Sequence, residues 1–250
     1  MGIATTRAVS LVGMQGHVVE VQAHLAASVP GFTLVGLPDA ALSESRDRVR
    51  AAVTSTGLPW PVKKITVNLS PASLRKQGSA YDLAIAVAIL AGVEGPSSAG
   101  LSRVGLDRVV HLGELGLDGR IQPVRGVLPT VAAAVDAGYP DVVVAAGDLD
   151  EARLVPGARV VGAASLAEVV ALHGGPPELV REVVAVRPTR SALAARLPGD
   201  LADVVGQERP RAALEVAAAG GHHLLLVGPP GVCPYRSMRG IMRTAWSGRF

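Results

Sequence analysis

A run of five residues, Gly228-Pro229-Pro230-Gly231-Val232, directly follows the apolar segment His223–Val227. A buried strand that enters a glycine-rich turn is typical of a phosphate-binding loop, in which backbone N–H groups surround the phosphates. A complete loop continues with Gly, with Lys to neutralise the terminal phosphates, and with Ser or Thr to hold Mg²⁺. Here those positions are Cys233, Pro234 and Tyr235. The sequence therefore predicts at most a partial, degenerate nucleotide site.

A second segment, Asp203–Gln207, lies about twenty residues before that loop, and a predicted helix at Glu208–Ala219 separates the two. Gly-Pro-Pro-Gly alone is typical of an ordinary turn, but the combination resembles the entry to an AAA+ ATPase module, where such a segment lies near the adenine. The resemblance implies nucleotide contacts from Val205, Gly206, Gln207, Gly228, Pro229, Pro230, Gly231 and Val232.

Three blocks in the front part of the chain narrow the resemblance. They are Gly31–Pro38 with Glu44–Arg50, then Ile65–Ala72 with Lys76, Gly78 and Tyr81-Asp82-Leu83, and finally Gly113-Glu114-Leu115 through Pro123–Gly126. In this order and spacing they resemble the amino-terminal signature of the Mg-chelatase-like YifB/ComM family, and the likeness covers residues 1–232. It implies a front domain with the Lon-protease-domain fold of ribosomal-protein-type βαβ units. It also implies a cytoplasmic, homo-hexameric AAA+ ATPase that uses ATP and Mg²⁺ and acts on DNA as a branch-migration helicase in recombination and competence.

A Lon-like fold raises the question of a Ser–Lys peptidase, whose two groups must lie within hydrogen-bond reach. The position that matches the nucleophile, two residues after Gly78, is Ala80, and Leu128 stands near the position of the catalytic Lys. The neighbouring Ser79 has no base close to it in sequence and is interpreted as a turn residue. No Lys follows Lys76, so we expect no peptidase activity and predict no catalytic residue in this chain.

Other polar residues give weaker signals. The six His show no ligand spacing with Cys or acidic residues, so no metal site is predicted. Arg46, Arg48 and Arg50 alternate with acidic residues, among them Glu44 and Asp47. This pattern favours a solvated, internally paired helix face over a phosphate site.

The elements that must position these groups alternate between strands and helices, which predicts a mixed α/β domain over residues 1–172. Strands are expected at 8–12, 18–25, 32–35, 65–69, 109–115, 120–124 and 142–144. Helices are expected at 39–56, 82–93, 127–137 and 165–173. Asp39 is the predicted N-cap of the first helix, the apolar 82–93 helix should be buried, and Asp118-Gly119 predicts a hairpin turn.

The rest of the chain divides by composition. Residues 173–199, rich in Gly, Pro and Arg, are predicted to be a linker, and residues 200–232 the start of a P-loop AAA+ domain. Residues 233–250 hold four Arg, no acidic residue and the single Cys, and we interpret them as an aberrant basic tail, produced out of frame or by divergence. The chain is then a family member truncated within the phosphate loop.

Charge and composition exclude several classes. The net charge of +3 arises in the tail, because the preceding residues carry 20 basic and 21 acidic side chains. Bulk charge therefore gives no argument for nucleic-acid binding. One Cys excludes a disulfide scaffold, no apolar run approaches a membrane span, and no leader is visible, so a cytoplasmic protein is expected.

Two function classes remain open. One is an ATP-dependent DNA motor of which this chain is an incomplete copy, without a working ATP and Mg²⁺ site. The other is a non-catalytic Lon-like module for protein interaction or self-association. Whether the chain is an enzyme stays undecided at this point.

Overall fold

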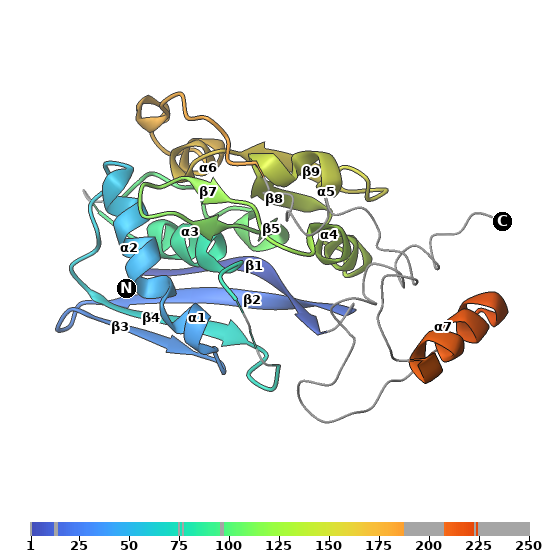
Figure 1. Ribbon diagram of the computed structural model, residues 1–250. Coiled ribbons are helices and arrows are strands. Elements are labelled where there is room, and N and C mark those ends of the chain that lie inside the picture. The colour runs from blue at the N-terminus through green and yellow to red at the C-terminus, as the bar shows by residue number, and fades with distance from the viewer. Residues whose placement is uncertain are drawn as a thin grey trace. The chain divides into compact units, whose positions relative to one another are not determined.

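The computed structural model describes residues 2–12, 15–74, 76, 78–95, 98–187, 208–222 and 224. The chain divides into two compact units, residues 1–188 and 189–250, and each is described by itself (Figure 1). The predicted nucleotide-site residues Val205, Gly206 and Gln207 lie outside the described residues, as does the whole predicted loop 228–232.

The first unit is built on one seven-stranded sheet with strand order β3-β4-β2-β1-β5-β8-β9. Strand β2 is antiparallel to both of its neighbours, and every other adjacent pair is parallel. The strands are β1 (Gly2–Val12), β2 (Gln15–Ala26), β3 (Gly31–Val35), β4 (Lys64–Ser70), β5 (Val109–His111), β8 (Asp141–Ala145) and β9 (Arg159–Ala163). A separate hairpin joins β6 (Glu114–Leu115) to β7 (Ile121–Gln122).

Helices cover the sheet on both faces, which confirms the predicted mixed α/β class (Figure 1). Helices α2, α3 and α6 belong to the larger core on one face, and α4 and α5 to a smaller core on the other. The helices of this unit are α1 (Ala40–Ser43), α2 (Ser45–Ser55), α3 (Asp82–Gly92), α4 (Val127–Asp136), α5 (Leu149–Ala152) and α6 (Leu166–Leu172). Short 3-10 turns are η1 (Leu106–Arg108), η2 (Ala146–Asp148) and η3 (Pro177–Leu179).

Helix α3 is the centre of the larger core. All of its residues are buried, from Asp82 to Gly92, as its apolar sequence predicted. It packs on β1 and β2, and Gly92 lies so close to Leu25 of β2 that an added Cβ would stand 2.6 Å from the Leu25 Cδ1 atom. Small Ala and Gly residues on α3 thus let the helix approach the sheet closely.

Several predicted elements differ from the structure. The single helix expected at 39–56 is two helices, α1 and α2, separated at Glu44. The strand expected at 109–115 splits, because both backbone groups of Gly113 bond to the start of α3: its N–H donates to the Ala80 carbonyl and its carbonyl accepts from the Leu83 N–H. The hairpin at Asp118-Gly119 is confirmed, with Gly119 at φ +84°.

Sequence analysis missed two elements, β9 and α5. Strand β9 begins with the charged Arg159 and contains Gly162, so only Val160 and Val161 carry a strand signal. It pairs with β8 along its whole length. The short α5 lies in the crossover between them, where the sequence shows no helical periodicity.

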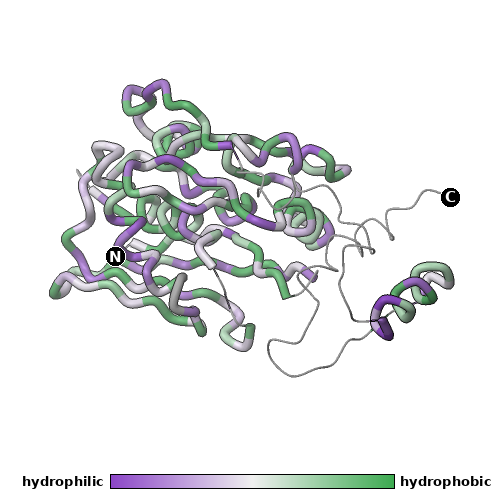
Figure 2. The backbone as a smooth tube through the Cα atoms, in the orientation of Figure 1, coloured by the Kyte–Doolittle hydropathy of each residue, from purple (hydrophilic) through white to green (hydrophobic). Residues whose placement is uncertain are grey.

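The second unit contributes α7 (Glu208–Gly220), which confirms the predicted helix. Figure 2 shows this helix hydrophilic at its amino-terminal end and mixed beyond. The strand expected at 223–227 lies outside the described residues except for Leu224. Within the ranges that the structure describes, no helix combines the length and apolar character needed to cross a bilayer.

Truncating a fully buried side chain of α3 should destabilise the first unit strongly. We expect Ile85→Ala to lower the free energy of unfolding by about 2–5 kcal/mol, because it leaves a cavity in the larger core. Leu154→Ala, at a side chain that is 71% exposed, should change it by less than about 0.5 kcal/mol. Urea unfolding followed by circular dichroism compares the two, and equal effects would contradict the central position of α3.

Candidate functional site

The loops that follow β3 and β4 meet at one end of the sheet. Because β3 and β4 are parallel, their carboxyl ends lie at the same end of the sheet. A β-bridge joins Pro38 to Lys76 there. The Lys76 N–H donates to the Leu37 carbonyl (3.4 Å) and its carbonyl accepts from the Asp39 N–H (3.1 Å). Two of the three family-like sequence blocks therefore meet at this end of the sheet.

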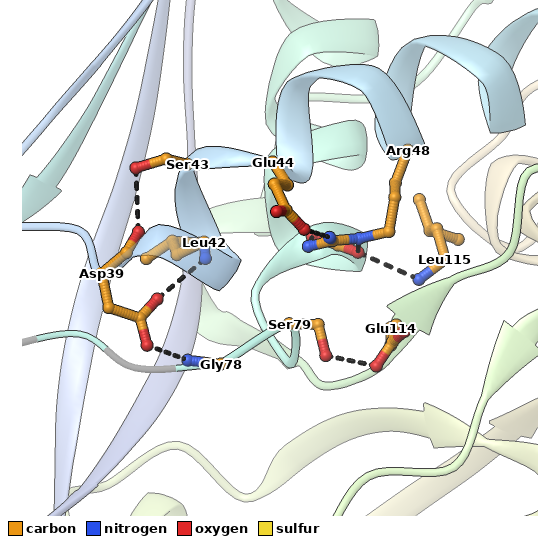
Figure 3. A network of polar contacts seen from close by, with 10 residues as sticks. Asp39, Leu42, Ser43, Glu44, Arg48, Gly78, Ser79, Glu114 and Leu115 are labelled. Carbon is orange, nitrogen blue, oxygen red and sulfur yellow. Dashed lines mark hydrogen bonds and ion pairs between the residues drawn. The ribbon is translucent and has the colours of Figure 1, made fainter.

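Asp39 holds the junction together with both carboxylate oxygens (Figure 3). Its Oδ1 accepts from the Leu42 N–H at 2.8 Å, which confirms the predicted helix cap, although the capped helix is the short α1. Its Oδ2 accepts from the Gly78 N–H at 3.0 Å. One carboxylate thus ties the start of α1 to the turn before α3.

A buried ion pair between Arg48 and Asp82 lies next to this junction. Arg48 donates from Nε to Oδ2 at 2.6 Å and from Nη2 to Oδ1 at 3.0 Å, and the Leu115 N–H donates to Oδ2 at 3.3 Å. The Asp82 side chain is fully buried and that of Arg48 is 18% exposed. Burial raises the pKa of Asp82 to about 6, although Arg48 opposes the shift.

The prediction that Arg48 belongs to a solvated helix face is therefore wrong. Its contact with the exposed Glu44, at 3.7 Å, is longer than the bonds to Asp82, which lies 34 residues away in sequence. Arg46, in contrast, forms the expected exposed pair with Asp47 at 3.5 Å. No local signal marked Arg48, because its partner is set by the packing of α2 on α3.

Ser79 donates its hydroxyl hydrogen to the Glu114 carboxylate, so the structure brings to Ser79 an acceptor that is 35 residues away in sequence (Figure 3). The third family-like block, which contains Glu114, joins the first two at this point. Asp39, Ser79, Asp82, Arg48 and Glu114 form what we call the junction network. Its bonds all link α1, α2, the start of α3 and β6.

The other positions that the sequence analysis compared with a Lon peptidase, Lys76, Ala80 and Leu128, make contacts within the fold or lie apart from one another. Lys76 is fully buried, donates from Nζ to the Pro71 carbonyl, and has its pKa lowered by burial. The Ala80 carbonyl accepts from Gly113, and Leu128 lies on α4, which packs on the opposite face of the sheet from α3. Among the described residues, no group of three potential metal ligands occurs.

Two histidines that gave no signal in the sequence contact each other. The Nε2 atoms of His111 on β5 and His173 at the end of α6 lie 2.8 Å apart. Burial lowers the pKa of both rings, that of His111 to about 3, and thus favours the neutral form of each. His173 also lines a depression of about 380 Å³ over β8 and β9, whose floor is apolar.

A buried carboxylate on the other face of the sheet was also missed. Asp148 is 3% exposed, and its Oδ2 accepts from the Val124 N–H at 2.9 Å. Burial raises its pKa to about 6, and the nearby Glu151 adds to the shift. Glu151 in turn accepts from the Leu128 N–H at the start of α4. Both carboxylates thus fix the loop that enters α4.

Comparison with known proteins identifies the family to which these blocks point. Residues 20–148, just over half of the chain, match the family described as subunit ChlI of Mg-chelatase, and residues 200–239 match a second family, described as magnesium chelatase, subunit ChlI. The chain belongs to the Mg-chelatase-like YifB/ComM family.

Its relatives come from several bacteria. The chain is 48% identical over 232 residues to the uncharacterized protein Rv2897c of Mycobacterium tuberculosis, covering 93% of this chain and 44% of the relative. It is 40% identical to the uncharacterized protein YifB of Escherichia coli over 92% of this chain and 43% of the relative. It is 36% identical to the competence protein ComM of Haemophilus influenzae over 92% and 44%. The chain thus spans less than half the length of the curated relatives it matches.

Removing Arg48, the cation of the junction network, should strongly destabilise the folded protein. We expect Arg48→Ala to destabilise the protein by about 3–5 kcal/mol, because Asp82 would remain buried without its partner. Arg159→Ala is the matched control. It breaks a pair with the same 2.6 Å separation, to Asp141, whose members are 67% and 41% exposed, and should have a far smaller effect because solvent screens the pair. Similar losses for the two variants in urea unfolding would contradict the structural role of Arg48.

The raised pKa of Asp148 predicts a pH dependence of known sign. Because the pKa of Asp148 is higher in the folded protein than in the unfolded chain, protonation of Asp148 stabilises the folded state. This stabilisation is fully present below about pH 4 and is lost as the pH rises through about 6. Relative to Asp148→Asn, the wild type should therefore gain about 2 kcal/mol between pH 7 and pH 4. Asp141→Asn should show a small effect of opposite sign, because Arg159 lowers the pKa of Asp141. Parallel stability curves for wild type and Asp148→Asn would rule this out.

Proposed function

We propose that the chain is the amino-terminal part of an AAA+ ATPase of YifB/ComM type that acts on DNA, and that the chain as written does not hydrolyse ATP. Family membership supports the first part, as does the name of the Haemophilus relative, competence protein ComM. The magnesium-chelatase match over residues 200–239 supports a nucleotide-binding origin for the segment that holds Gly228–Val232. In this proposal Val205, Gly206 and Gln207 lie on the adenine side of the site.

The loss of activity rests on one observation: the phosphate loop begins correctly and then lacks its chemical groups. Pro234 stands where a Lys would neutralise the terminal phosphates, and it has no N–H to offer them. Tyr235 replaces the Ser or Thr whose hydroxyl would hold Mg²⁺. The residues present do not fit ATP with Mg²⁺, so we derive no catalytic step for this chain.

A second function, a non-catalytic interaction module, is favoured by the first unit itself. Its sheet, its two cores and the junction network are complete within residues 2–187. A unit of this kind can fold and bind partners without nucleotide. We further propose that it has the Lon-like fold, that the family's homo-hexamer and DNA are the partners of the complete motor, and that the protein is cytoplasmic.

Nucleotide titration separates these functions. We expect no Mg²⁺-dependent ATP binding by the full chain at micromolar concentrations, and no phosphate release. The matched variant Cys233→Gly/Pro234→Lys/Tyr235→Thr restores the missing groups, and binding that appears only in this variant would locate the defect in the loop. Calorimetry and a phosphate-release assay measure both proteins. Micromolar Mg²⁺-dependent binding or hydrolysis by the unaltered chain would overturn the proposal that it is inactive.

A further inference from the structure

The two edges of the seven-stranded sheet differ in how they are protected. At one edge, β9 begins with Arg159, which is paired to Asp141, and η2 and α5 pack against it so closely that a Cβ on Gly162 would meet Leu149 at 3.1 Å. At the other edge lies β3, with sequence Gly-Phe-Thr-Leu-Val and no charged or proline residue. Natural edge strands are usually blunted by charges, Pro or a covering element. Strand β3 itself contains no charge and no Pro, although Pro30 directly precedes it, and among the described residues no further strand pairs with its outer side.

The apolar side chains in and beside β3 are only partly buried or exposed. Phe32 and Leu34 point toward the larger core but are only partly buried, since β3 has a neighbour on one side alone. On the other face Val35 is 46% exposed. Just beyond the ends of the strand, Val29 is 81% exposed and Leu37 is 60% exposed, the latter with the uncommon φ of +56°.

The backbone of β3 also presents unused groups at this edge. Gly31 donates its N–H to the Lys63 carbonyl, and β3 pairs with β4 in register from Gly31 to Val35. Because successive residues of a strand direct their N–H and C=O groups to opposite sides, Thr33 and Val35 also face β4. The N–H and C=O groups of Phe32 and Leu34 therefore face away from the sheet.

We propose that β3 is an interface for a second copy of this chain, which adds its own β3 in antiparallel orientation about a two-fold axis at Thr33. In this register Phe32 lies opposite Leu34 of the second copy, so that every outward N–H and C=O of both residues gains a partner. The two partly buried side chains extend both cores across the axis.

Within the strand, the same axis places the exposed Val35 of one copy opposite Gly31 of the other. The pairing ends there, because Gly36 and Leu37 have positive φ and Val29 lies in a bend. A strand without charges pairs with itself free of repulsion, as a two-fold interface requires. A second copy thus fits this edge in backbone, side chains and charge.

This inference does not rest on the proposed ATPase. A ring of six subunits is built from head-to-tail contacts, whereas the β3 contact joins identical surfaces. The experiments below need neither nucleotide nor DNA, so their outcome leaves the nucleotide-loop proposal unaffected.

A disulfide tests the register. In the full chain with Cys233→Ser, Thr33→Cys should form a covalent dimer on oxidation, because the two copies of residue 33 lie directly opposite each other. Thr66→Cys is the matched control, since Thr66 is the register partner of Thr33 on β4. Its two copies would be separated by three strand spacings, roughly 14 Å, which is beyond disulfide reach. Equal cross-linking of both variants, or none of Thr33→Cys, would overturn the proposal.

Sedimentation velocity over a concentration series tests the contact without a cross-link. We expect a reversible dimer of the full chain, and Thr33→Lys should raise its dissociation constant by at least about tenfold by placing two like charges opposite each other. Val161→Lys, a partly exposed position of β9 at the other edge, should leave the constant unchanged. A monomer at every concentration, or a dimer that Thr33→Lys does not weaken or that Val161→Lys weakens equally, would show that β3 does not join two copies.

Discussion

The first unit depends on the complete burial of α3. A helix that is apolar on every side cannot lie on the surface of a sheet with one face in water, so it must be enclosed. Strands β1 and β2 form its floor, and α2, α6 and β6 pack around it. Because the enclosing elements come from distant parts of the sequence, burial of this one helix brings the family-like blocks together.

Because α3 is enclosed, the charge of Asp82 at its first position is buried, and the junction network supplies the partners of this charge. Asp82 occupies the first position of the helix. Its negative charge interacts favourably with the positive end of the helix dipole, but the side chain is shielded from water. Arg48 and the Leu115 N–H satisfy its oxygens, and the raised pKa shows that desolvation still outweighs them. A buried pair of this kind restricts how α2 docks on α3, because a displaced α2 would leave the Asp82 charge buried without its partner.

The sequence was sufficient for features that are encoded locally. The buried helix at 82–93, the Asp39 cap and the turn at Gly119 each follow from neighbouring residues. Contacts between distant residues were not predictable, because Arg48 and Asp82, or His111 and His173, show no spacing that relates them. Strand β9 was missed for a related reason: its place in the sheet comes from pairing with β8, not from its own weak strand propensity.

The predicted phosphate loop and the junction network differ in the same way, since the first is encoded locally and the second by contacts between distant residues. A phosphate loop is defined by consecutive residues, so the prediction at Gly228–Val232, with Pro234 in the place of Lys, needs the sequence alone. In the first unit, polar side chains in and next to the family-like blocks close loops: Asp39 accepts from the Gly78 N–H, Lys76 donates to the Pro71 carbonyl, and Ser79 donates to Glu114. Each of these side chains is occupied by another part of the same fold. These side chains thus fix the loops around β3, β4 and α3 in this chain, and they do so through contacts that no sequence spacing announces.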